Sequence, residues 1–184
     1  MLQRLKTLVC SLAFLTFFIG TPAHALQCAP FAREFSGLQL FGNAATWWGQ
    51  ASGRYDRGAA PQVGSVLVFK ATGAMRVGHV AMVSQVVGDR EIKVTHANWS
   101  VIGGRRGQIE RDVTVVDASP NNDWSQVKVW YAPIHDVGTK AYPVYGFIYS
   151  GNAPVQMASA DAAGDAAAVP ANLPGFAGTR TLLP

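Results

Sequence analysis

Cys28 and the histidines at positions 79 and 96 are the residues whose types allow nucleophilic chemistry. Cys28 comes just before Pro30, and proline fits the first turn of a helix because it needs no N–H partner there. A thiol at a helix N-terminus meets unpaired N–H groups and the positive end of the helix dipole, and both lower its pKa. The sequence therefore predicts that Cys28 is a nucleophile served by a histidine base. A buried, inert cysteine is the competing interpretation.

His79 is the favoured base, because it begins a predicted strand and follows Gly78, whose small size leaves room for a thiol or a substrate. Two Val- and Ile-rich segments flank Gly88-Asp89, and a two-residue turn there places His79 opposite Asn98. His96 lies two positions before Asn98 and so shares its face, since side chains alternate along a strand. We expect His96 to orient the imidazole of His79. Asn98 would support it, and a glutamate in place of His96 would preserve the chemistry.

The N-terminal segment has the layout of a secretory signal peptide. A basic pair precedes the apolar run Leu8–Gly20, and the small-residue triplet 23–25 follows it. The run is too short to span a membrane, so the chain is expected in the periplasm or secreted, without stable membrane insertion. Cleavage removes Cys10 and leaves Cys28 as the one cysteine, which excludes a disulfide within the chain. Lipid attachment to Cys28 is disfavoured by the size of Gln27.

The charge balance argues against a nucleic-acid-binding protein. The whole chain has 15 Lys and Arg against 11 Asp and Glu. Without the predicted leader the balance is 13 against 11, a net charge of +2. Nucleic-acid binders instead show a basic stripe. The tight cluster Arg105-Arg106 is predicted to lie in a solvated loop, and His135 on the surface.

The composition divides the chain into residues 1–25, the predicted signal peptide; 26–151, a packed domain; and 152–184, a flexible tail rich in Ala, Gly and Pro. Within the domain helices precede strands, which predicts an α+β fold with N-terminal helices packed on an antiparallel β-sheet. The expected helices are 30–36 and 44–51, and the expected strands are 65–69, 79–87, 91–99, 108–116, 126–131 and 144–149.

Five motifs in order along the chain resemble those of the CHAP family, the cysteine, histidine-dependent amidohydrolases and peptidases. They are Cys28-Ala29-Pro30-Phe31-Ala32-Arg33, Ala45-Thr46-Trp47-Trp48, Pro61-Gln62-Val63-Gly64-Ser65-Val66, Gly78-His79-Val80-Ala81 and His96-Ala97-Asn98-Trp99.

The resemblance implies a papain-like fold acting on peptidoglycan, as an N-acetylmuramoyl-L-alanine amidase or an endopeptidase. It implies Cys28 as nucleophile and His79 as base. The family's third polar residue falls at His96, where a glutamate is often found, and Asn98 is the polar residue two positions on. His96 is therefore a departure from the pattern.

No metal and no organic cofactor is expected, since one thiol and scattered histidines do not form a ligand cluster. Trp48 and Trp99 are candidates for lining a cleft that binds sugar or peptide, although core packing is the competing role for Trp48. Two other functions remain open. One is a non-catalytic cell-wall-binding module of the same fold, and the other is a cysteine acyltransferase. The oligomeric state stays open as well.

Overall fold

The computed structural model describes residues 25–151. Residues 1–24 and 152–184 lie outside the described residues, and with them nearly all of the predicted signal peptide and the whole predicted tail. The chain divides into two units, residues 1–154 and 155–184, and everything described below belongs to the first. No helix among the described residues is both long enough and apolar enough to cross a membrane.

The helices lie where the sequence predicts them. α1 (Cys28–Ser36) begins at the candidate nucleophile and ends at Gly37, whose φ of 73° is left-handed and whose N–H donates to the Arg33 carbonyl at 3.1 Å. The segment expected at 44–51 is divided into a 3₁₀ turn, η1 (Ala44–Thr46), and a short helix, α2 (Trp47–Gln50). A further 3₁₀ turn, η2 (Ala132–Ile134), lies late in the domain.

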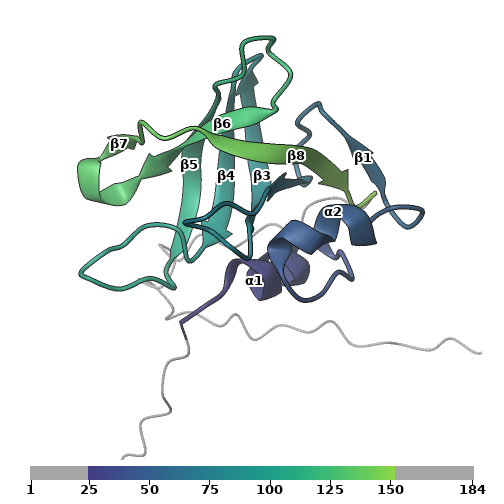
Figure 1. Ribbon diagram of the computed structural model, residues 1–184, viewed down its shortest axis with the longest axis horizontal. Helices are drawn as coiled ribbons and strands as arrows, with labels where there is room; N and C mark the ends of the chain where they lie inside the picture. The colour runs from purple at the N-terminus through teal and green to yellow at the C-terminus, as the bar shows by residue number, and fades with distance from the viewer. Residues whose placement is uncertain (1–24, 152–184) are drawn as a thin grey trace, which may run out of the picture. The chain divides into compact units, whose positions relative to one another are not determined.

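The strands form one antiparallel sheet that closes on itself. Its order is β1-β8-β2-β3-β4-β5-β6-β7, and β8 also pairs with β6, so six strands make a barrel (Figure 1). The antiparallel pairing was predicted, whereas the closure was not. The strands are β1 (Asp56–Gly58), β2 (Val66–Phe69), β3 (His79–Gly88), β4 (Glu91–Ala97), β5 (Ile109–Asp117), β6 (Gln126–Tyr131), β7 (Asp136–Val137) and β8 (Tyr142–Tyr149). The short strands β1 and β7 were not predicted.

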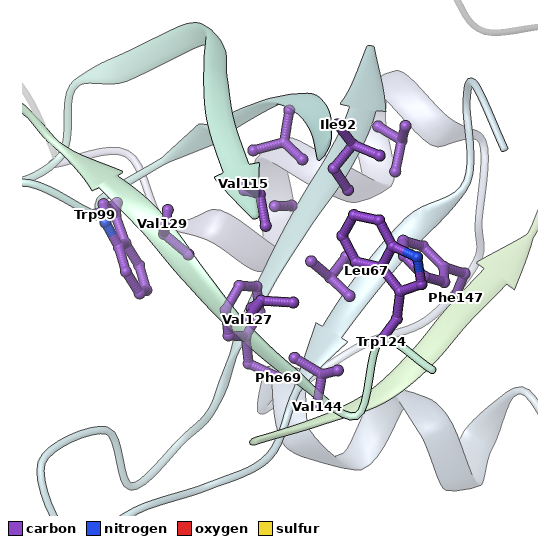
Figure 2. Packing of buried hydrophobic residues seen from close by; sticks show 13 residues of the cluster. Leu67, Phe69, Ile92, Trp99, Val115, Trp124, Val127, Val129, Val144 and Phe147 are labelled. Carbon is purple, nitrogen blue, oxygen red and sulfur yellow. The ribbon is translucent and has the colours of Figure 1, made fainter. Parts of the chain in front are cut away.

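Strand β2 separates two buried clusters. Leu67 and Phe69 point into a cluster with strands β3 to β6 and β8, which Figure 2 shows from close by. Val66 and Val68 point the other way, into a cluster with Ala29 and other residues of α1 and α2. All four strand residues are therefore buried, as the continuous apolar run indicated. Through Val80, the second cluster joins the start of α1 to β3, the strand that carries His79.

The turn between β3 and β4 lies one residue later than predicted. Gly88 pairs with Glu91, so the turn residues are Asp89-Arg90. Two register shifts along the hairpin then restore the predicted offset, so that Met82 pairs with Thr95 at the other end. The face of the strands near the site is therefore the one that the sequence indicated, although the turn that fixed it was placed wrongly.

Candidate active site

Cys28 is the first residue of α1 and is 8% exposed. Burial raises the pKa of its thiol, and the opposing hydrogen bonds from the backbone N–H groups of Val80, Ala29 and Cys28 itself do not outweigh it. The expected helix-terminus effect is thus present, but the predicted direction of the shift is wrong. The resting sulfur is a neutral thiol.

His79 is the first residue of β3 and is buried, with its ring centroid 4.9 Å from that of Trp99. Burial lowers the pKa of this imidazole well below its ordinary value, and the nearby His96 and Arg106 lower it further. The imidazole is therefore neutral at pH 7. Neutral thiol and neutral imidazole face the same cleft, which is the resting state of a general-base mechanism and not a preformed ion pair.

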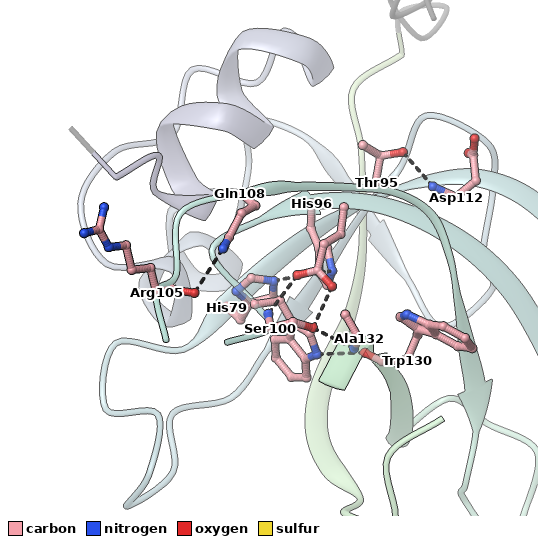
Figure 3. A network of polar contacts seen from close by, with 11 residues as sticks. His79, Thr95, His96, Ser100, Arg105, Gln108, Asp112, Trp130 and Ala132 are labelled. Carbon is pink, nitrogen blue, oxygen red and sulfur yellow. Dashed lines mark hydrogen bonds and ion pairs between the residues drawn. The ribbon is translucent and has the colours of Figure 1, made fainter. Parts of the chain in front are cut away.

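His96 hydrogen-bonds to His79, with His79 Nε2 and His96 Nδ1 3.0 Å apart (Figure 3). The His96 ring is fully buried, and burial lowers its pKa to about 3. The two imidazoles lie on one face of the β3–β4 hairpin, where the sequence placed them. His96 can therefore orient His79 as a neutral partner.

Glu110, on β5, is a buried acid that the sequence reasoning missed. It is the strand partner of His96, and its Oε1 lies 3.9 Å from His96 Nε2. That nitrogen is buried and has no hydrogen-bond partner among residues 25–151. The carboxylate accepts from Ser100 N at 2.7 Å and from Ser100 Oγ at 2.6 Å, and this hydroxyl accepts from Ala132 N at 3.1 Å (Figure 3).

The position of the Glu110 side chain indicates which histidine nitrogens carry protons. A carboxylate only accepts, so the arrangement favours a proton on His96 Nε2, facing Glu110. Nδ1 of His96 is then the acceptor, and His79 donates to it through Nε2–H. This leaves Nδ1 of His79 unprotonated and free to take a proton from a thiol.

Asn98 does not face His79 as predicted. It follows the end of β4 with a φ of 66°, which turns it away from the alternation of the strand. Its Nδ2 donates to Gln27 Oε1 at 2.9 Å. The predicted pairing with His79 is therefore wrong, although Asn98 does line the cleft beside Cys28. Its amide ties the end of β4 to the residue just before α1.

A cleft of about 380 Å³ opens over these residues. Trp99 lines it, as the sequence predicted, but is only 7% exposed because it packs on both histidines. Trp48 does not line it and instead stacks on Tyr145, with centroids 5.9 Å apart. The predicted place of Trp48 in the cleft is therefore wrong. The full lining is Gln27, Cys28, Ala74, Met75, Arg76, Val77, Gly78, His79, Asn98, Trp99, Arg106, Tyr131, Lys140 and Tyr142.

His135, Arg105 and Arg106 were predicted to lie on the surface, and Arg106 differs from the other two in lining the cleft. His135 is exposed directly after η2, as predicted. Arg105 and Arg106 are exposed in the β4–β5 loop, also as predicted, but Arg106 lines the cleft. No group of three His, Cys, Asp or Glu side chains within the described part of the chain could hold a metal ion.

Gly78 holds His79 in place through its lack of a side chain. Its φ is 71°, and a Cβ there would lie 2.7 Å from both the Cβ and the N of Ala45 and 2.8 Å from the Phe69 carbonyl. The glycine is thus required by packing, and the room predicted there for a thiol or a substrate is filled by Ala45.

Gly78→Ala is therefore expected to destabilise the protein by at least about 2 kcal/mol, because backbone strain adds to a backbone clash. Thermal unfolding measures this. Gly73→Ala, in the same β2–β3 loop with no atom within 4 Å of the added Cβ, is the matched control and should change little. Equal effects of the two substitutions would contradict the packing argument.

A family model described as the CHAP domain matches residues 19–98, a stretch that contains the thiol, both buried histidines and Asn98. It ends before Glu110, which lies on the next strand. No curated protein matches the chain.

Proposed function

We propose that this chain, whose residues 19–98 match the CHAP domain, is an exported cysteine hydrolase that cleaves amide bonds in peptidoglycan, as an amidase or an endopeptidase. The observation that carries the proposal is a thiol at a helix start that shares one cleft with a buried imidazole, itself hydrogen-bonded to a second imidazole. The predicted signal peptide supports export.

The first half of the reaction would form a thioester. Nδ1 of His79 accepts the thiol proton while the Cys28 sulfur bonds to the carbonyl carbon of the amide. The tetrahedral oxyanion meets backbone N–H groups, for which those around the sulfur at the start of α1 are the candidates. As the intermediate collapses, the C–N bond breaks and His79 returns its proton to the leaving amine.

The second half would release the acyl group. Water attacks the thioester carbon while His79 accepts a proton from it. The C–S bond then breaks and His79 gives this proton to the departing sulfur, which leaves a carboxylic acid and the free thiol. If an amine attacked instead of water, the same site would act as an acyltransferase.

Glu110 would supply the negative charge that His96 lacks. When His79 becomes an imidazolium in this buried site, its Nε2–H donates to His96, whose own Nε2–H faces the Glu110 carboxylate. Electrostatic interactions are stronger in such surroundings than in water. The acid that the resemblance to the CHAP family implies at the position of His96 would in this way be replaced by a histidine and a glutamate acting in series.

Digestion of purified peptidoglycan, followed by mass spectrometry of the released fragments, tests the function. An amidase frees whole stem peptides with a new alanine N-terminus, and an endopeptidase frees shortened peptides. Fragments extended by an added amine would identify acyl transfer. The Cys28→Ala protein is the control, and equal release by it, or none by the unaltered chain, would favour a non-catalytic wall-binding module.

A further inference from the structure

Three cations from three separate loops meet at the cleft. Arg76 follows β2, Arg106 lies between β4 and β5, and Lys140 lies between β7 and β8. No aspartate or glutamate is among the residues that line this cleft. The cleft therefore has one sign of charge around the candidate nucleophile.

None of the three cations is neutralised by a neighbour within residues 25–151. The salt bridges there involve Arg90, Lys93 and His96 instead. Lys140 makes a different contact, with its Nζ 5.0 Å from the ring centroid of Tyr142, which also lines the cleft. All three side chains are exposed and so are available to a ligand.

The loops that carry the two arginines are internally braced. Thr72 and Met75 exchange two backbone hydrogen bonds just before Arg76. Ile102 and Arg105 do the same just before Arg106, and Gln108 Nε2 donates to both of their carbonyls, at 3.2 and 3.0 Å; Figure 3 shows its bond to Arg105. Braced loops hold the charges at defined places, which lowers the entropy lost when a ligand binds.

The charge of Arg106 acts on two side chains of the cleft, His79 and Tyr142. The pKa of His79 is lowered first by burial, then by His96, and then by Arg106. The pKa of Tyr142 is raised by burial, and Arg106 acts against that rise. Since the predicted mature chain carries a net charge of only +2, this concentration of positive charge is local to the cleft and does not reflect a generally basic surface.

We propose that this cleft binds peptides carrying free carboxylates beside the amide to be cut, with Arg76, Arg106 and Lys140 as the residues that recognise them. The proposal rests on the proposed function and adds to it the chemical class of the substrate. Peptidoglycan stem peptides fit, because they carry carboxylates on a γ-linked glutamate and at their end. Arginine suits this role, since its planar fork can bind a carboxylate with two hydrogen bonds.

Calorimetric binding to the Cys28→Ala chain tests the proposal without requiring turnover. The probes are one stem tetrapeptide with free carboxylates and the same peptide with its carboxylates converted to carboxamides. We expect the free acid to bind roughly 10-fold more tightly at low salt, and this preference to shrink in about 0.5 M salt, where exposed charges are screened. Equal affinities for the two peptides would overturn the proposal.

Variants then locate the effect. Arg106→Gln and Lys140→Gln should each weaken binding of the free acid by about 2- to 5-fold and leave the carboxamide unchanged. Arg105→Gln, which removes an arginine from the same loop but not from the cleft, is the matched control and should change neither. If inorganic phosphate displaced the peptide at equal concentration, the site would be a general anion site and the carboxylate assignment would be wrong. Because these readouts are affinities, failure to cut peptidoglycan would count against the proposed function alone.

Discussion

Replacing Cys28 with serine is expected to lower kcat/KM on peptidoglycan by about 10⁴-fold or more, since the loss of a catalytic nucleophile has effects of this size. A serine hydroxyl is harder to deprotonate than a thiol, and the base proposed for it is the neutral His79. His79→Ala should cost a similar factor, because the thiol of Cys28 is itself neutral at rest. The rate of fragment release measures both variants, and circular dichroism shows whether each folds.

His135→Ala is the matched control for the His79 substitution. It removes an exposed histidine outside the cleft and should leave the rate unchanged. Turnover by the Cys28 or His79 variant equal to that of the unaltered chain would refute the mechanism.

The pH profile gives an independent check on the base. His79 must be neutral to accept a proton, and its pKa in the folded protein is lowered by burial. A lowered pKa keeps the base neutral to lower pH. The acid limb of kcat/KM, which reports the free enzyme, should therefore lie below pH 6.5, the ordinary value for histidine. An acid limb at or above that value would show a base that is charged or exposed.

His96→Glu is expected to reduce activity by about 10²-fold or more, although the sequence alone predicted that a glutamate would be tolerated there. The structure reverses this expectation because Glu110 already lies 3.9 Å from the ring of His96. A glutamate at position 96 would place a second buried carboxylate beside Glu110, and the repulsion between the two charges would disturb the orientation of His79. The rate of fragment release is the measurement.

The double variant separates charge repulsion from a simple loss of shape. Adding Glu110→Gln to His96→Glu removes one of the two carboxylates and should restore a large part of the rate. Glu110→Gln alone should lower the rate while His96 keeps its place. Asn98→Ala should lower the rate less than His96→Ala does, because Asn98 contacts Gln27 and not His79. A double variant no better than His96→Glu would show that Glu110 is structural only.

Features set by local sequence were predicted well. α1 and its glycine end, the buried strand β2, and the shared face of His79 and His96 follow from helix-end signals and side-chain periodicity. The face was predicted from a turn that proved to be one residue off, and the later register shifts in the hairpin cancelled that error. The predicted face is therefore correct partly because of register shifts that no local sequence pattern predicts.

Features set by distant contacts were not predicted. Barrel closure depends on the pairing of β6 with β8, and the residue pattern of a strand does not identify the strand with which it pairs. Glu110 reaches His96 across a loop of 11 residues, whose length leaves the register of β5 open, so no count along the sequence could place it. The predicted direction of the pKa shift of Cys28 was wrong, because the helix end can be recognised in the sequence whereas the burial of the thiol cannot.

The buried, protonated state of Cys28 also bears on how long such a protein could last in an oxidising compartment. Peroxides and disulfides react with thiolates far faster than with thiols, and they need access to the sulfur. Here Cys28 is only 8% exposed, and burial raises the pKa of its thiol. Both features slow oxidation of the resting thiol, and under the proposed mechanism the proton leaves as the sulfur attacks a substrate that covers it. Its lifetime would be limited by the chemistry it performs more than by the oxidants around it.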